Sequence, residues 1–289
     1  MAYQTIGFIG AGNMAEAMVG AIIHSGLFMP KDIYLSDVNE QRLDYTKQRF
    51  SVNVTPQNDA VFTHSDIVIL AVKPQVMSDV LSTLRVFEHT WHGKKLMVSI
   101  AAGILIKSIE QIVYAGLSRV DQKRLPIIRV MPNTPAMVMS GVSGVCANQY
   151  AQDEDVQMLN RLLACMGKVI QCSEEQIHAI TAISGSGPAY TFYFIESMIE
   201  AAKQLGFSNE EAPEIVLATC QGAIELLKKT NESPETLRKN VTSKGGTTEA
   251  AISVMQTKQI KSVIIEAIFS AHSRSKELSQ IFKEQMKIK

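Results

Sequence analysis

The chain has 289 residues, of which 46% are hydrophobic and 19% are charged, and its 28 basic and 28 acidic residues leave no formal net charge. This length allows a sizeable core and favours about two domains. The balanced charge indicates neither nucleic acid nor a membrane surface as a partner.

We expect no segment that directs this protein to a membrane or to an oxidising compartment. Met1 leads directly into an apolar segment without the basic stretch of a signal peptide, and the longest apolar run, residues 97–106, is too short to span a bilayer. The four cysteines have no metal-type or redox-type spacing. His178 and His272 have no partner at a metal-ligand spacing, so we expect no metal site. These observations predict a cytoplasmic protein.

The first part of the chain alternates short apolar runs with amphipathic stretches. Helical spacing of apolar residues over 15–24 and 40–50 predicts helices between buried strands. The predicted strands cover residues 5–9, 33–36, 67–72, 97–100, 127–131, 143–147 and 169–172. Such continuously apolar strands are typical of a largely parallel sheet. We therefore predict an α/β fold with an N-terminal Rossmann-like, doubly wound domain over residues 1–172.

The rest of the chain, residues 173–289, predicts helices and no strand. Capping-box spacing begins at Ser173 and again at Ser208, and Pro188 suits a first helical turn. Apolar residues recur at helical spacing over 260–282, which predicts a long final helix. This all-helical domain has wide apolar faces, which favour a dimerisation surface. Packing of these faces against the first domain is the alternative.

A glycine turn follows the first predicted strand. The strand over residues 5–9 runs into Gly10-Ala11-Gly12-Asn13-Met14-Ala15 and then into a helical pattern. Gly10 allows a tight turn, Gly12 lets backbone approach a pyrophosphate, and Ala15 lets helix and strand pack closely. The N–H groups at the start of the helix attract phosphates. This context predicts that residues 10–14 bind a nicotinamide dinucleotide; a glycine turn without a ligand is the alternative.

Ser36 and Asp37 end the second predicted strand, where dinucleotide-binding folds contact the adenosine ribose. Asp37 lies 22 residues after Ala15, near the spacing of the acid that binds the ribose hydroxyls of NAD. The first basic residue after it is Arg42, so charge favours NADH over NADPH. Alternatively, Asp37 caps the helix that begins near Glu40, and both roles can hold.

Three further segments have the composition of ligand-binding loops. Ala71-Val72-Lys73-Pro74 ends one predicted strand, and Met131-Pro132-Asn133-Thr134-Pro135 follows another. The third segment, Val241-Thr242-Ser243-Lys244-Gly245-Gly246-Thr247-Thr248, is a glycine turn that runs into a helix. Such a turn predicts a second anion-binding site, in this case for an anionic substrate.

Over essentially the whole chain, these motifs resemble those of the pyrroline-5-carboxylate reductase family. The resemblance is carried by residues 8–15, 71–74, 131–135 and 241–248, and by Ser184-Gly185-Ser186-Gly187-Pro188-Ala189-Tyr190. It implies reduction of L-1-pyrroline-5-carboxylate to L-proline by hydride from NADPH or NADH, the last step of proline synthesis. It also implies that the helical domain forms dimers, which in some members assemble into larger rings.

The resemblance implies roles for residues of the second glycine turn. Thr248 and Ser243 are the catalytic candidates, and Thr248 would donate a hydrogen bond to the imine nitrogen. Gly245, Gly246 and Thr247, together with Ser243, would hold the substrate carboxylate, largely through backbone N–H groups. Protonation of a basic imine requires little more than orientation and one hydrogen bond.

On the cofactor side, the resemblance places Asn58 near the adenosine. It places Lys73 and Pro74, with Ala71 and Val72 before them, beside the nicotinamide ribose. We do not assign Lys73 as a general acid, because a surface charge at a strand end explains it equally well.

The sequence departs from the family pattern in two places. Lys244 stands where the family often has proline, which adds positive charge near the proposed carboxylate site. Asp37 and Val38 stand where the family often has Asn-Arg, residues that suit NADPH. The second departure makes NADH a plausible cofactor for this chain.

Two other functions fit parts of the sequence. A β-hydroxyacid dehydrogenase would have a lysine soon after a glycine-rich segment such as residues 184–187, where this chain has Tyr190 and Thr191. A catalytically silent nucleotide-binding paralogue would be free to lose the turn over residues 245–248, which is intact here. Both features favour imine reduction.

Overall fold

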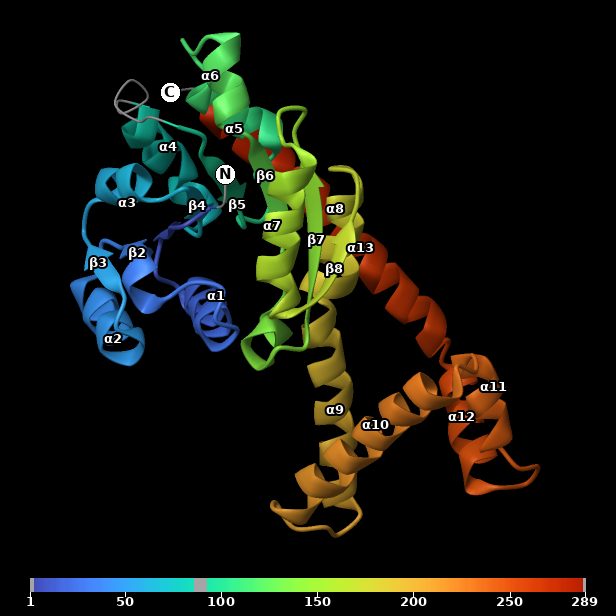
Figure 1. Cartoon of the computed structure of the whole chain (residues 1–289). Helices are drawn as coiled ribbons and strands as arrows, with labels where there is room; N and C mark the ends of the chain where they lie inside the picture. The colour runs from blue at the N-terminus through green and yellow to red at the C-terminus, as the bar shows by residue number, and fades with distance from the viewer. Residues whose placement is uncertain (1–2, 86–92, 288–289) are drawn as a thin grey trace. The chain divides into compact units, whose positions relative to one another are not determined.

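The computed structural model, which describes residues 3–85 and 93–287, contains an eight-stranded sheet in the order β3-β2-β1-β4-β5-β6-β7-β8 (Figure 1). Its strands are β1 (Ile6–Ile9), β2 (Ile33–Ser36), β3 (Asn53–Thr55), β4 (Ile67–Leu70), β5 (Leu96–Ser99), β6 (Ile127–Met131), β7 (Gly141–Ala147) and β8 (Gly167–Gln171). Neighbouring strands are parallel except for β6 and β7. The α/β fold predicted from the sequence is confirmed.

Helices cover both faces of the sheet, because both faces of its central strands are apolar. In β4, Ile67 and Ile69 pack with α1, α2 and α7, whereas Val68 and Leu70 pack with α3, α4 and α5. The helices of this part are α1 (Asn13–His24), α2 (Glu40–Phe50), α3 (Asn58–His64), α4 (Met77–Arg85), α5 (Ile106–Val113), α6 (Arg119–Arg124), α7 (Asp153–Ala164) and α8 (Gln176–Ile180). Successive residues of such a strand point to opposite faces of the sheet, and both faces are buried. The strand therefore appears in the sequence as a continuous apolar run.

One strand was missed by the sequence prediction. Strand β3 has only three residues, Asn53–Thr55, at the edge of the sheet, and none of them is fully buried. A short, half-exposed edge strand has no continuous apolar run that could distinguish it from a loop. The seven predicted strands are all present, with ends that shift by at most two residues.

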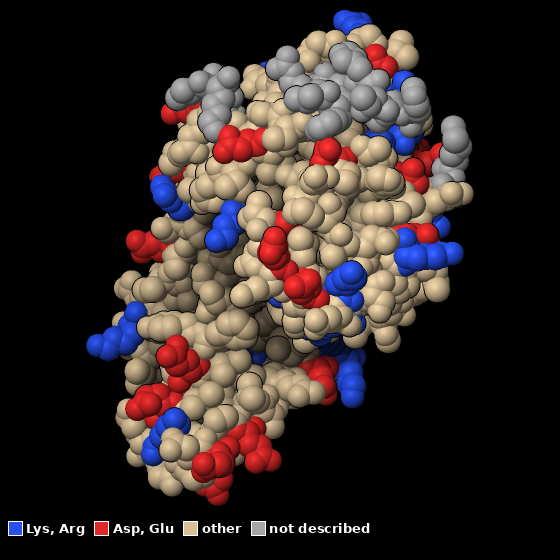
Figure 2. Space-filling view, turned by 90° about the vertical axis from the view of Figure 1, so that its left-hand side faces the viewer, with Lys and Arg blue, Asp and Glu red and all other residues tan. Residues whose placement is uncertain are grey.

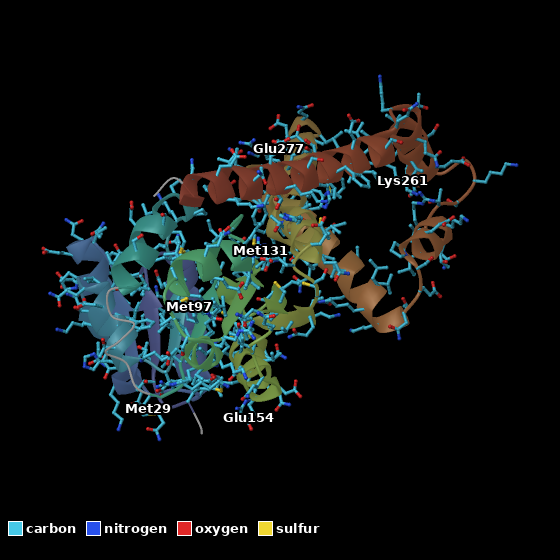
Figure 3. All side chains as sticks on the ribbon, turned by 90° about the horizontal axis from the view of Figure 1, so that it is seen from above. Met29, Met97, Met131, Glu154, Lys261 and Glu277 are labelled. Carbon is cyan, nitrogen blue, oxygen red and sulfur yellow. The ribbon has the colours of Figure 1, made fainter. Side chains whose placement is uncertain are left out.

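By contacts between Cα atoms, the chain forms two compact units. The first contains residues 1–185 and 271–289, and the second contains residues 186–270. This division differs from the predicted boundary after residue 172, which followed the change from strands to helices. The difference arises because α8 and the end of α13 (Ile260–Lys287) pack with the sheet: Ile177 and Phe282 are buried in its core. Helix α13 (Ile260–Lys287) therefore contributes to both units, as Lys261 and Glu277 mark in Figure 3.

The second unit consists of helices. It contains α9 (Gly187–Gln204), α10 (Glu211–Thr230), α11 (Pro234–Asn240), α12 (Thr247–Thr257) and the first part of α13. Both predicted capping boxes form: Ser173 with Gln176 ahead of α8, and Ser208 with Glu211 ahead of α10. In this unit, all of which is described, the buried apolar cluster is limited to Ala202, Ala212 and Val216.

Many large apolar side chains of the second unit are instead exposed. They come from every one of its long helices and include Phe192, Tyr193, Phe194, Leu217, Ile224, Val254, Val263, Ile264 and Phe269. So many exposed apolar side chains around a core this small are typical of a surface that another chain covers.

The surface carries no single dominant charge on the face that Figure 2 shows. Acidic and basic side chains are interspersed there among larger uncharged areas. Among residues 3–85 and 93–287, no helix is both long and apolar enough to cross a membrane.

Candidate active site

The first glycine turn lies where the strand order of the sheet reverses. Strand β1 pairs with β2 on one side and with β4 on the other, so the turn after Ile9 stands at a topological switch point, the usual ligand position in such sheets. Gly10 has a φ of 100°, and its N–H donates to the Ser36 carbonyl at 2.8 Å. A Cβ on Gly10 would lie 2.8 Å from the Ala71 carbonyl oxygen. Only glycine suits this position.

Gly12 leaves open space above the start of α1. It is the N-cap residue of the helix, and no side chain of the described residues caps it. A Cβ built on Gly12 meets no described heavy atom within 4 Å. The first N–H groups of α1, from Asn13 and Met14, thus face unfilled space and attract an anion through the helix dipole. This geometry fits a pyrophosphate, whereas Ala15 is buried against the core as expected.

The residues predicted to hold the adenosine end lie together, at the C-terminal end of β2 and the start of α3. The Ser36 hydroxyl donates to the Asn58 side-chain oxygen at 2.8 Å. The Asp37 carboxylate accepts from the N–H of Ala11 at 2.8 Å and from that of Asn39 at 2.9 Å. Asp37 therefore connects the end of the second strand to the glycine turn.

The interpretation of Asp37 as the cap of α2 is wrong. The N-cap residue is Asn39, whose side-chain oxygen accepts from the Arg42 N–H at 3.2 Å. Asp37 stands two residues earlier, and its carboxylate is turned towards the glycine turn instead. A negative charge is thereby held where a dinucleotide-binding fold places the adenosine ribose.

A cluster of charged residues beside the turn was missed by sequence reasoning. The Glu16 carboxylate accepts from Arg42, from the Arg49 guanidinium at 2.5 Å and from the Tyr45 hydroxyl at 3.1 Å. Arg42 also donates from Nε to the Ala11 carbonyl at 2.5 Å. The signal in the sequence is the spacing of Arg42, Tyr45 and Arg49, which places all three on one face of α2.

The segment predicted to lie beside the nicotinamide begins directly after β4. The Ala71 N–H donates to the Ile9 carbonyl at 2.8 Å, which holds the ends of β1 and β4 together. Val72 is half-buried, and its side chain lies 3.0 Å from the position of a Cβ on Gly10. Lys73 is exposed and precedes the 3-10 turn Pro74–Val76. Residues 71–74 therefore share one edge of the sheet with the glycine turn.

Asn133 joins two of the family motifs inside the first unit. Its side-chain amide donates to the carbonyl and the hydroxyl of Ser184, at 3.1 and 3.0 Å, and its oxygen accepts from the Val142 N–H at 2.8 Å. Asn133 is 8% exposed, and a Cβ on Gly185 would overlap the Met131 side chain. The motifs at 131–135 and 184–185 thus support one another structurally.

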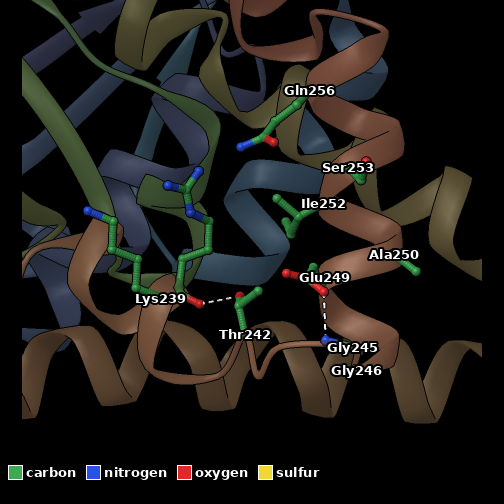
Figure 4. Close-up of a pocket in the computed structure, with 10 residues that line it drawn as sticks. Lys239, Thr242, Gly245, Gly246, Glu249, Ala250, Ile252, Ser253 and Gln256 are labelled. Atoms are coloured by element: carbon green, nitrogen blue, oxygen red, sulfur yellow. Dashed lines mark hydrogen bonds between the residues drawn. The ribbon is translucent and has the colours of Figure 1, made fainter.

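The second glycine turn belongs to the second unit, where Figure 4 shows the adjacent pocket. Gly245 has a φ of 74°, and its N–H donates to the Glu249 carboxylate at 2.6 Å. The Gly246 N–H donates to the Ser243 carbonyl at 3.0 Å, and the Ser243 hydroxyl lies 2.5 Å from the position of a Cβ on Gly246. The positive φ of Gly245 favours glycine there, and the N–H groups of both glycines are used within the turn.

The start of α12 adds further donors to this turn. Gly246 is the N-cap residue of the helix, and no side chain of the described residues caps it. The first-turn N–H groups of Thr247 and Thr248 are consequently available to an anion. The Thr248 side chain is half-buried, whereas Ser243 and Thr247 are exposed. The start of α12 therefore places the N–H groups of both predicted threonines next to the glycine turn.

His178 and Cys146 are titratable side chains in the interior of the first unit. His178 is buried, and its Nδ1 lies 3.0 Å from the Ser275 hydroxyl. Burial, followed by the charge of Arg129, lowers the pKa of His178 below its usual value. All four cysteines are free thiols, and burial raises the pKa of Cys146 to about 12. Within residues 3–85 and 93–287, no group of three or more His, Cys, Asp or Glu is placed to hold a metal ion.

Two family models match the chain. Residues 174–278 match the model described as pyrroline-5-carboxylate reductase dimerisation. Residues 5–103 match the model described as NADP oxidoreductase, coenzyme F420-dependent. The first match covers the helices of the second unit, and the second covers the part of the sheet that carries the first glycine turn.

Curated relatives and solved structures are similar over nearly the full length. Pyrroline-5-carboxylate reductase 2 of Bacillus subtilis is 37% identical over 280 residues, with 96% of each chain covered. The Pseudomonas aeruginosa pyrroline-5-carboxylate reductase is 36% identical and covers 97% of this chain and 98% of its own. The structure of a Coxiella burnetii pyrroline-5-carboxylate reductase is 36% identical, with a TM-score of 0.83 over 96% of this chain and 98% of that one.

A further solved structure was determined with its cofactor. The Plasmodium falciparum pyrroline carboxylate reductase with NADP bound is 29% identical to this chain, with a TM-score of 0.83 over 96% of this chain and 98% of that one. The agreement in sequence and in fold extends over 96% of this chain for both solved structures. The chain belongs to the pyrroline-5-carboxylate reductase family.

Proposed function

We propose that this protein reduces L-1-pyrroline-5-carboxylate to L-proline with hydride from a nicotinamide dinucleotide. The observation that carries the proposal is a pair of glycine turns, each followed by an uncapped helix start: Gly12 before α1 and Gly246 before α12. The first turn fits a pyrophosphate, and the second fits a small carboxylate. Because the chain belongs to this family, we assign the cofactor pyrophosphate and the substrate carboxylate to one reaction.

In this reaction the second unit binds and orients the substrate. The Thr247 and Thr248 N–H groups hold the carboxylate, because the N–H groups of both glycines are used within the turn. The Thr248 hydroxyl donates a hydrogen bond to the imine nitrogen, which favours its protonated form. The Ser243 carbonyl accepts from the Gly246 N–H at 3.0 Å and so stabilises the turn. A protonated imine accepts hydride without a strong acid, so orientation supplies most of the catalysis.

In the first unit, residues 10–14 bind the pyrophosphate, while Ser36, Asp37 and Asn58 surround the adenosine ribose. Residues 71–74 lie beside the nicotinamide ribose. When bound, the reduced cofactor supplies the hydride. The Asp37 carboxylate disfavours a 2′-phosphate by charge repulsion, so we propose that NADH serves at least as well as NADPH.

Self-association through the second unit completes the proposal. A dimer interface over α9, α10, α12 and α13 would explain why this unit has a large exposed apolar surface and a small buried core. We retain the helical region from residue 173 as the dimerisation and substrate-binding domain, after a nucleotide-binding domain over residues 1–172. Four free thiols are consistent with a cytoplasmic location, which we also propose.

The test is a reductase assay with both cofactors. Purified protein should oxidise NADH or NADPH near neutral pH when L-1-pyrroline-5-carboxylate is added, and should reduce NAD or NADP with L-proline at high pH. Protein that binds nucleotide but shows neither reaction would be the silent paralogue. Reduction of a β-keto acid in place of the imine would favour the hydroxyacid dehydrogenase.

A further inference from the structure

A carboxylate in the first turn of α1 is surrounded by hydrogen-bond donors from α2. Glu16, in the first turn of α1, has a side chain that is 15% exposed, and both of its oxygens accept from α2. One oxygen accepts from Arg42, and the other accepts from Arg49 at 2.5 Å and from the Tyr45 hydroxyl at 3.1 Å. Two guanidinium groups and a hydroxyl that converge on one anion are the donors that a phosphate monoester prefers.

This cluster is attached to the glycine turn at the adenosine end. Arg42 donates from Nε to the Ala11 carbonyl at 2.5 Å, and the N–H of Ala11 donates to Asp37 at 2.8 Å. The two faces of one peptide segment thus contact Arg42 and Asp37. In dinucleotide-binding folds the adenosine ribose lies at the end of the second strand, where Asp37 stands, and a nearby arginine receives the 2′-phosphate of NADP.

We infer that Glu16 is a specificity-determining residue, which lowers the affinity for NADPH by occupying with its own carboxylate the guanidinium groups that would bind the 2′-phosphate. The inference rests on the proposed use of a nicotinamide dinucleotide. Glu16 touches neither reacting atom and acts through Arg42 and Arg49. To accept a 2′-phosphate, the chain first has to break ion pairs that NADH leaves intact.

The structure gives Glu16 room to be displaced. A cavity of about 200 Å³ lies beside the cluster, lined by Glu16, Gly20, His24, Arg49 and Met139 among others. Because Glu16 itself lines this cavity, there is open space beside its carboxylate for a displaced side chain. NADPH is therefore disfavoured without being sterically excluded, because its binding competes with an internal ion pair.

Removal of the charge of Glu16 should free Arg42 and Arg49 to bind a 2′-phosphate. In Glu16→Gln, the amide still accepts one hydrogen bond, while Arg42 and Arg49 lose their shared counter-charge. We expect binding of 2′,5′-ADP, which carries the 2′-phosphate, to tighten by about tenfold, the range of one charge-assisted hydrogen bond. Binding of 5′-ADP, which lacks that group, should remain within about twofold of the unchanged chain.

The experiment measures both nucleotides by isothermal titration calorimetry on the full chain without substrate. The matched control is Glu40→Gln, which removes the same charge from an exposed position in the first turn of α2. It should leave both affinities unchanged. The double variant Glu16→Gln/Arg42→Gln should lose the gain for 2′,5′-ADP, because the released guanidinium is gone. In Glu16→Asp the shorter carboxylate should give a smaller gain, which provides a second test if the glutamine variant does not fold.

Unchanged 2′,5′-ADP binding in Glu16→Gln, or an equal gain for both nucleotides, would overturn the inference. So would a gain that persists in the double variant. These outcomes are separate from the reductase activity: a chain that reduces the imine but shows no selective gain refutes the role of Glu16 alone. Conversely, a selective gain in a chain without reductase activity refutes the proposed reaction alone. Among active variants, Glu16→Gln should also raise the ratio of kcat/KM with NADPH to kcat/KM with NADH.

Discussion

Alanine substitutions of Gly12 and Gly10 should have different effects: the first should weaken cofactor binding, and the second should lower stability. Gly12 has a φ of −70° and a ψ of 179°, which alanine adopts freely, and a Cβ there meets no described heavy atom within 4 Å. Gly12→Ala should therefore cost about 1 kcal/mol of stability or less, through the poorer N-cap alone. The new methyl group would nevertheless stand where the pyrophosphate approaches the backbone.

The cost in cofactor binding should be larger than the cost in folding. Displacement of the pyrophosphate by one methyl group loses at least one hydrogen bond to a charged oxygen, worth about 1.5–3 kcal/mol. The dissociation constant of NADH should rise by about tenfold to a hundredfold. Fluorescence titration of the reduced cofactor measures this change, and thermal unfolding without cofactor measures stability.

Gly10→Ala is the matched comparison. At a φ of 100°, with its Cβ 2.8 Å from the Ala71 carbonyl oxygen, alanine is strained in the folded protein before any ligand binds. Strain of this kind costs about 1–3 kcal/mol, and each kcal/mol lowers Tm by about 2–4 °C in a domain of this size. If Gly12→Ala binds NADH as tightly as the unchanged chain does, the pyrophosphate does not lie over this turn and the argument from geometry fails.

Three further predictions concern the remaining parts of the site and the core. Thr248→Ala should lower turnover by about tenfold to a hundredfold with little change in cofactor affinity, and an unchanged steady-state rate would remove Thr248 from the mechanism. Asp37→Asn keeps an acceptor for the glycine turn but removes the charge, so the ratio of kcat/KM with NADPH to that with NADH should rise by about tenfold; no rise would leave Asp37 a purely structural role. Burial lowers the pKa of His178 below the usual 6.5, so the unfolded chain binds the proton more readily, and stability present above pH 6.5 is lost as pH falls through the folded-state pKa. His178→Asn should flatten the fall in Tm between neutral and mildly acidic pH, and an equally steep fall would assign it to other groups.

The strands and the two glycine turns could be predicted from the sequence because local chemistry determines them. Continuous apolar runs such as β4 identify strands that are buried on both faces, and a glycine between strand and helix identifies an anion site. The family motifs extended this prediction to the reaction. The short edge strand β3 escaped because an exposed polar segment has no such periodicity.

Side-chain partners that are far apart in sequence could be found only in the tertiary structure. Asp37 was an equal candidate for a helix cap and for a ribose ligand until the folded chain placed its carboxylate on the N–H of Ala11. The Glu16 ion pairs join residues of α1 and α2 that are at least 26 positions apart.

The division of the chain into two compact units could also be found only in the tertiary structure. The change from strands to helices after residue 172 is visible in the sequence, but the packing of α8 and the end of α13 with the sheet is not. The sequence alone therefore determined the class of fold, the cofactor turn and the family, since each depends on residues close together along the chain. Which groups hold the glycine turn, and which carboxylate pairs with Arg42, depended on contacts that only folding creates.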